Sequence, residues 1–134
     1  MNENVSMRLS LALLILLGSL SVSASEFDET KALAEQGDAD AQFALGYNYY
    51  AGIGAPQDYK EALRWYRASA EQGDQYAQSS LAKMYYDGEG TSQDYKEALR
   101  WFKASAVQGY ASSQFNLGLM YKNGEGTPQD YKEA

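Results

Sequence analysis

The sequence predicts an all-α solenoid built from antiparallel helix pairs. Three observations carry this prediction: a 36-residue internal repeat, apolar residues at helical spacing within each copy, and glycines at fixed places between the apolar segments. Residues 34–69 and 70–105 agree at 23 of 36 positions without a gap, and residues 106–134 form a third, incomplete copy. Fixed periods of about 20–50 residues are typical of repeat proteins whose units stack on one another.

The first 24 residues differ from the rest and indicate a secretory signal peptide. A basic residue precedes an apolar run over residues 9–20, and small residues that end at Ala24 provide a cleavage site. A start at Met7 in place of Met1 would remove the acidic Glu3 from the basic region. The alternative, an uncleaved membrane anchor, needs an apolar run of about 20 residues, longer than this one.

The expected mature chain begins with a short helix and continues as repeats. Residues 33–37 read LAEQG, which resembles the end of a second helix (SAEQG, residues 69–73), so we predict a lone N-terminal capping helix over residues 25–36. Terminal units of repeat proteins commonly differ from the internal ones in this way. The repeats then occupy residues 37–134.

The second helix of each unit begins at an aspartate. Asp58 and Glu61 resemble a capping box, in which Asp58 accepts from the first amides and Glu61 reaches back to the cap. The pairs Asp94/Glu97 and Asp130/Glu133 repeat the pattern. We expect the first of these helices to end at Gly73.

Because an α-helix has 3.6 residues per turn, the side chains of this helix fall on two opposite faces. One stripe is charged and should face solvent; it contains Lys60, Arg64, Arg67 and Glu71. The opposite stripe should face the core; it contains Ala62, Trp65, Tyr66 and Ser69.

The first helix of each unit begins near Asp38, Asp74 or Tyr110 and ends at a glycine, Gly52, Gly88 or Gly124. Its buried side contains Ala41, Leu45 and Tyr49. Gly46, Ala82 and Gly118 share one position, where a small residue should let the paired helix approach closely. The six-residue link over residues 53–58 is short, so the two helices should run antiparallel.

The recurring positions resemble the Sel1-like repeat, a relative of the tetratricopeptide repeat. The first copy carries them as Ala41, Gln42, Leu45, Gly46, Tyr49, Gly52, Gly54, Asp58, Ala62 and Trp65, and the later copies repeat most of them. The departures are Asn48 for the usual Met and Ala82 for Gly. The resemblance implies a right-handed superhelix and a scaffold role, with bacterial members acting at the envelope or in host interaction.

The amino-acid composition excludes most catalytic mechanisms. The chain contains no His and no Cys, so neither a Ser-His-Asp arrangement nor a conventional zinc site can be built. Some cysteine-rich relatives have been described as β-lactamase-like, an activity not carried over to a chain without Cys. A net charge of −7 disfavours nucleic acid and anionic membranes. We therefore predict no enzyme and no cofactor.

One short motif keeps an alternative open. Ser80 and Lys83 match the S-x-x-K pattern of penicillin-recognising enzymes, and three residues on a helix bring two side chains together. The other repeats do not keep this pair, and no companion motif is present. The alternative function is a cell-wall-associated or β-lactam-interacting protein.

The positions of the first helices that differ most between copies lie within an arc of about 120° opposite the core. If the first helices line the concave side, this arc faces a groove that suits a peptide or protein. The predicted binding residues are Phe43, Tyr47, Tyr50, Lys83, Tyr86, Asp87, Phe115, Leu119 and Lys122. In the alternative, Phe43 and Phe115 pack between neighbouring units.

The third copy stops inside its second helix. Ala134 aligns with Ala62 and Ala98, before the expected Trp. One interpretation is a fragment of a longer array, which we favour; the other is an open edge that pairs with another chain and allows an oligomer. With the signal peptide, the prediction is a protein-binding or peptide-binding scaffold of the periplasm or the extracellular space.

Overall fold

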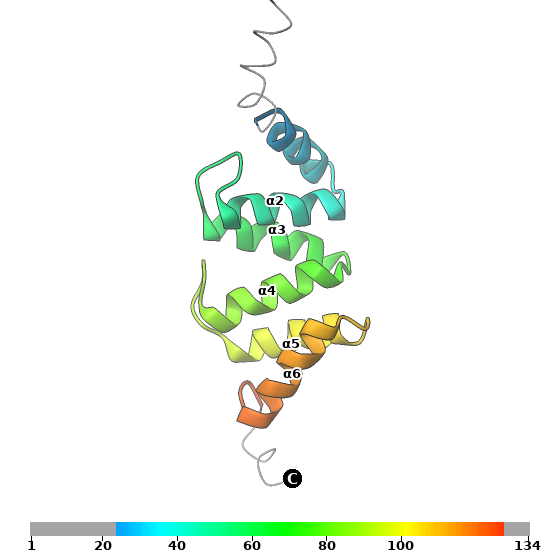
Figure 1. Cartoon of the computed structure of the whole chain (residues 1–134), viewed down its shortest axis with the longest axis vertical. Coiled ribbons are helices and arrows are strands. Elements are labelled where there is room, and N and C mark those ends of the chain that lie inside the picture. The colour runs from blue at the N-terminus through cyan, green and yellow to red at the C-terminus, as the bar shows by residue number, and fades with distance from the viewer. Residues whose placement is uncertain (1–23, 128–134) are drawn as a thin grey trace, which may run out of the picture.

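The computed structural model describes residues 24–127, and every regular element in that range is a helix. A helical segment over residues 24–35 leads into a stack of labelled helices (Figure 1). Their bounds are α2 (Ala39–Ala51), α3 (Tyr59–Glu71), α4 (Gln75–Asp87), α5 (Tyr95–Ala106) and α6 (Ala111–Asn123). The predicted all-α repeat fold is confirmed. The predicted signal peptide lies outside the described residues, apart from Ala24.

The helices form pairs that stack along the long axis of the molecule (Figure 1). Within a pair, α2 packs on α3 and α4 packs on α5; between pairs, α3 packs on α4 and α5 packs on α6. Each helix thus contacts its neighbours in sequence, as expected for a solenoid. Within residues 24–127, no helix combines the length and the apolar character needed to span a bilayer.

The aspartates cap the second helices as predicted, but the reciprocal half of the capping box is wrong. Asp58 accepts from the backbone amides of Lys60 and Glu61 at 3.0 and 3.1 Å. Glu61 instead pairs with Arg64 at 3.2 Å. The backbone N–H of Asp58 has another partner, because it donates to the carbonyl of Tyr49 at 2.9 Å. That bond ties the start of α3 to the end of α2.

The second unit repeats this arrangement. Asp94 accepts from the amide of Glu97 at 3.0 Å, and its own N–H donates to the Tyr85 carbonyl at 2.8 Å. Glu97 pairs with Arg100 at 3.3 Å. The expected third pair, Asp130 and Glu133, lies outside the described residues.

The first helices end at glycine, as predicted. Gly52, Gly88 and Gly124 have φ values of 72°, 72° and 67°, in the left-handed region that other residues rarely adopt. The second helix α3 ends at Glu71 with Gln72 as its C-cap at φ of −82°, and the predicted Gly73 follows in the turn with φ of 97°.

The two predicted stripes of α3 are confirmed. Ala62, Trp65, Tyr66 and Ser69 are buried, and Lys60, Arg64, Arg67 and Glu71 are exposed. Trp65 and its repeat equivalent Trp101 are only 6% and 8% exposed. The helical segment over residues 24–35 joins this core, because Ala34 is buried in one cluster with Trp65, and Phe27 packs against it.

Polar side chains at the end of each second helix bind the start of the first helix of the same pair. The Ser69 hydroxyl donates to the Ala39 carbonyl at 2.7 Å. The Gln72 amide donates to the Gly37 carbonyl at 2.9 Å and to the Gln42 side chain at 2.7 Å. The same bonds recur 36 residues later through Ser105, Gln108 and Gln78. These bonds satisfy backbone groups that the turns leave unpaired, and they fix how the two helices of a pair sit against each other.

The predicted close approach at Gly46 is confirmed. A Cβ at this position would lie 2.6 Å from Cδ1 of Tyr66, so the ring of Tyr66 occupies the space that a side chain would need. The equivalent Ala82 is fully buried in the second unit, where Phe102 replaces Tyr66.

We expect Gly46→Ala to destabilise the fold. Overpacking costs about 1–3 kcal/mol, which exceeds the helix-propensity gain of up to about 1 kcal/mol. The net loss in free energy of unfolding should be about 1 kcal/mol by urea denaturation. The cost should be smaller in a Tyr66→Phe background, where the ring has no hydroxyl to hold it in place. Equal or higher stability of Gly46→Ala in both backgrounds would contradict the close contact.

Candidate functional site

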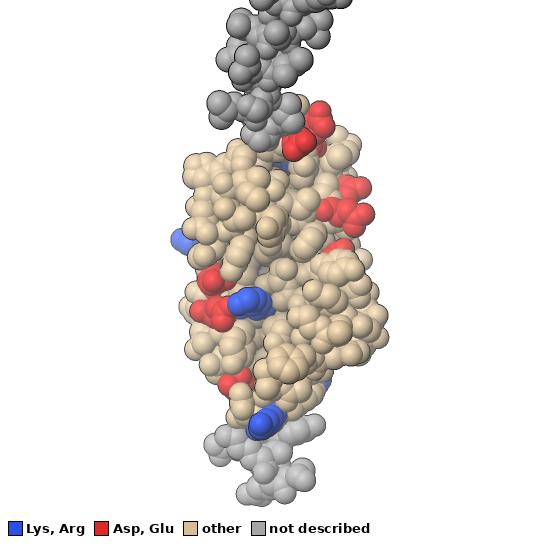
Figure 2. Space-filling view, viewed as in Figure 1, with Lys and Arg blue, Asp and Glu red and all other residues tan. Residues whose placement is uncertain are grey.

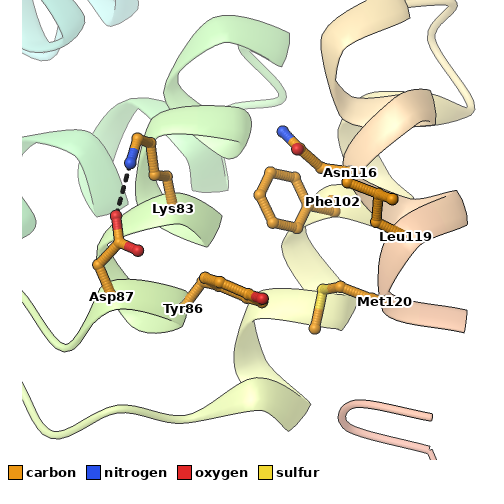
Figure 3. Close-up of a pocket in the computed structure, with 7 residues that line it drawn as sticks. All are labelled: Lys83, Tyr86, Asp87, Phe102, Asn116, Leu119 and Met120. Carbon is orange, nitrogen blue, oxygen red and sulfur yellow. Dashed lines mark hydrogen bonds and ion pairs between the residues drawn. The ribbon is translucent and has the colours of Figure 1, made fainter. Parts of the chain in front are cut away.

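Two cavities open between successive first helices. The α2–α4 cavity has a volume of about 190 Å³ and is lined by Tyr47, Tyr50, Tyr66, Ser80, Lys83, Met84 and Glu89. The α4–α6 cavity has a volume of about 200 Å³ and is lined by Lys83, Tyr86, Asp87, Phe102, Asn116, Leu119 and Met120 (Figure 3). Lys83 lines both cavities, so they adjoin, and we call them together the groove.

The two cavities are repeat copies of each other. A shift of 36 residues carries six of the seven lining positions of the first cavity onto the second. Tyr66 and Phe102, for example, are equivalent buried aromatics that each come from a second helix. The groove is therefore a product of the stacking itself, and each further unit of the same kind would extend it.

The repeats have changed the chemistry of the cavities at a few positions. Tyr47 in the first cavity corresponds to Lys83 in the second, and Lys83 in the first corresponds to Leu119 in the second. The α2–α4 cavity therefore has three tyrosines and a glutamate in its wall. The α4–α6 cavity has Phe102 and Leu119 on one side and an ion pair on the other (Figure 3).

That ion pair joins Lys83 Nζ to Asp87 Oδ2 at 2.5 Å. The hydrogen bond to Asp87 raises the pKa of Lys83, which keeps its amine protonated at neutral pH. A protonated amine cannot accept a proton from Ser80, and the Ser80 hydroxyl is itself hydrogen-bonded to Tyr66. The geometry therefore does not activate Ser80 as a nucleophile. Among the described residues, no cluster of acidic side chains could hold a metal ion.

Tyrosine hydroxyls connect the first helices to the loop of the next unit. Tyr50 donates to Glu89 Oε1 at 3.3 Å. Burial and this hydrogen bond raise the pKa of Tyr50 to about 12. In the next unit a hydrogen bond to Glu125 raises the pKa of Tyr86. The two hydrogen bonds hold both phenols at the side of the groove.

The predicted binding residues divide into two groups. Six of them line the groove: Tyr47, Tyr50, Lys83, Tyr86, Asp87 and Leu119. Phe43 lies outside both cavities, because its ring packs on Tyr66 at 5.7 Å and on Tyr76 at 6.1 Å between centroids. Phe115, which is 67% exposed, and Lys122 also lie outside both cavities.

The sequence reasoning missed several lining residues. It assigned Tyr66 and Phe102 only to the core, and it did not place Met84, Met120 or Glu89 in the groove. Glu89 could have been noticed, because a charged residue between two turn glycines, Gly88 and Gly90, is placed at the end of the first helix. Nothing in the neighbouring sequence indicates that Glu89 contacts the preceding unit.

Figure 2 shows a face of the stack made mostly of uncharged side chains, with a basic group near its centre and acidic groups toward its edges. Stacked helix pairs with a groove along the first helices define a helical repeat protein of the scaffold type. The model of the Sel1 repeat matches residues 39–74, 75–110 and 111–134, so this chain belongs to the Sel1 repeat family. Proteins of this family generally act as scaffolds for protein–protein interaction.

Solved structures agree with this assignment. A protective antigen of uropathogenic Escherichia coli strains, which displays an SLR fold, is 42% identical with a TM-score of 0.72 over 75% of this chain and 22% of its own. A Sel1 repeat protein from Oxalobacter formigenes is 36% identical with a TM-score of 0.76 over 79% of this chain and 44% of its own. This chain therefore spans less than half of either protein.

A more distant structure, Helicobacter pylori cysteine rich protein B, is 22% identical with a TM-score of 0.65, covering 68% of each chain. At that identity it supports the fold alone. No curated protein matches this sequence.

The raised pKa of Tyr50 predicts a loss of stability in alkaline solution. Because the folded value is about 12 and the ordinary value is 10.0, this stabilisation is complete below pH 10 and is lost as the pH rises toward 12. Tyr50→Phe should therefore lose less stability than the unmodified chain over that interval, measured by urea denaturation. Tyr47→Phe serves as the control for removal of one hydroxyl. An identical alkaline loss in Tyr50→Phe would contradict the assignment.

Proposed function

We propose that this chain is a non-enzymatic scaffold that binds a peptide or protein segment in the groove, in the periplasm or outside the cell. The observation that carries the proposal is the repeated cavity between first helices. A groove built twice from equivalent positions, with different side chains in each copy, provides successive pockets for successive side chains of one ligand.

The side chains in the groove have the chemistry of a recognition surface. Tyr47 is 51% exposed and yet sits at the wall of a cavity. Tyrosine offers a large contact area and loses little conformational entropy on binding, because only two side-chain angles must be ordered. The hydrogen bonds of Tyr50 and Tyr86 to the following loops reduce that cost further, since their rings are held before a ligand arrives.

Truncation of the groove tyrosines should abolish binding. Peptides selected from a random display library on the unmodified protein provide the ligand. The triple variant Tyr47→Ala, Tyr50→Ala, Tyr86→Ala should bind the selected peptides at least about tenfold more weakly, because buried aromatic contacts commonly contribute more than about 2 kcal/mol. Calorimetry measures the affinity, and helical circular dichroism checks the fold.

Tyr76→Ala is the matched control. Tyr76 is 48% exposed, close to the value for Tyr47, and lies on α4 outside both cavities. Its loss should leave peptide affinity unchanged. Equal affinity of the triple variant and the unmodified protein would place the binding surface elsewhere.

The proposed location outside the cytoplasm rests on the apolar run over residues 9–20 and the small residues before Ser25. Expression of the whole chain in a Gram-negative host should release a periplasmic protein whose N-terminal residue is Ser25, read by mass spectrometry. A cytoplasmic product that still begins at Met1 or Met7 would contradict the proposed location and would leave the groove unaffected.

A further inference from the structure

The α2–α4 cavity contains a carboxylate that is only half satisfied. Glu89 lines this cavity, and its Oε1 accepts from the Tyr50 hydroxyl at 3.3 Å. Its Oε2 is buried and has no hydrogen-bond partner among the described residues. A carboxylate oxygen removed from water costs free energy unless a donor or a cation approaches it. Glu89 therefore keeps an unused acceptor oxygen, which a positively charged ligand group would reach after the carboxylate turns toward the cavity.

The nearest basic side chain is shared between Glu89 and a second carboxylate. Lys83 lines the same cavity, but its ammonium group is bound to Asp87 at 2.5 Å, one turn further along α4. Figure 3 shows the Lys83 amine directed to Asp87. Counted together, Lys83, Asp87 and Glu89 carry one net negative charge. The chain as a whole also carries −7, which would attract a basic partner over longer distances.

The rest of the wall suits the same kind of group. Tyr47, Tyr50 and Tyr66 line the cavity, and phenol rings attract ammonium and guanidinium groups through their π-electrons. The volume is about 190 Å³. A cavity of about 150 Å³ accepts benzene, so there is room for the side chain of one residue.

From this arrangement we propose that the α2–α4 cavity takes the side chain of a Lys or Arg residue of the bound peptide, with its cationic group beside Glu89. The inference rests on the proposed function and adds the chemistry of the ligand. The α4–α6 cavity differs, because Lys83 holds the position of Tyr47 and Leu119 adds apolar surface.

The adjoining repeat offers a matched control residue. Glu125 is the equivalent of Glu89 and also has a buried Oε2 without a hydrogen-bond partner in the described part of the chain. It does not line the α4–α6 cavity. Glu125→Gln therefore removes the charge of a glutamate at this repeat position without changing the wall of either cavity.

The test uses capped pentapeptides with leucine on both sides of a central Arg, norleucine or Glu, titrated by NMR against the whole chain. We expect the Arg peptide to bind about ten times more tightly than the other two, consistent with one desolvated charge pair. Glu89→Gln should remove this advantage and leave the affinity for the norleucine peptide unchanged, because the amide oxygen can still accept from Tyr50. Glu125→Gln should change neither affinity.

A second variant tests the sign of the charge. Lys83→Met removes a cation from the cavity wall, so the Arg peptide should bind more tightly to it and the Glu peptide more weakly. Equal binding of the Arg and norleucine peptides, absence of binding by all three, or an unchanged Arg preference in Glu89→Gln would each overturn the inference. If the triple tyrosine variant failed to bind the library-selected peptides, the proposed function would still stand. Failure of this inference can therefore be distinguished from failure of the proposed function.

Discussion

The buried aromatic side chain of each second helix connects the fold to the groove. Tyr66 fills the space left by Gly46 on α2, and it also lines the cavity that α2 forms with α4. Phe102 has the same place one unit later. Because one ring packs against two first helices, the stacking of the units and the shape of the binding surface depend on the same contacts. A substitution in this core would change the groove as well as the stability.

Hydrogen bonds at the turns fix the relative positions of the helices more closely than apolar packing does. Apolar surfaces tolerate sliding, whereas hydrogen bonds from Ser69 and Gln72 to the preceding turn are directional and short. Because equivalent bonds recur through Ser105 and Gln108, the two helices of each pair are placed on one another in the same way. Between pairs, Gln78 and Gln114 donate to the carbonyls of Ala70 and Ala106 at 3.2 and 3.1 Å. The equivalence of the two cavities follows from both sets of bonds.

Regular stacking leaves the chemistry of each cavity to a few variable side chains. Replacement of Tyr47 by Lys83 at the equivalent position changes an aromatic wall into one that carries an ion pair. A loop residue, Glu89, gives the first cavity its negative charge. The backbone and the buried rings thus provide pockets of similar size, and surface substitutions decide what each pocket prefers, which is the division of roles expected of a repeat scaffold.

The sequence by itself determined the 36-residue period, the helix bounds, the glycine ends and the buried stripe around Trp65, because each depends on neighbours within one or two helical turns. Helical spacing also placed Tyr47, Tyr50 and Tyr86 on one surface. Only the tertiary structure decided that Phe43 packs against Tyr66 and Tyr76 and that Glu89 joins the groove. Tyr50 and Glu89 are 39 residues apart, so their contact depends on how one unit rests on the next, and helical periodicity carries no information about that.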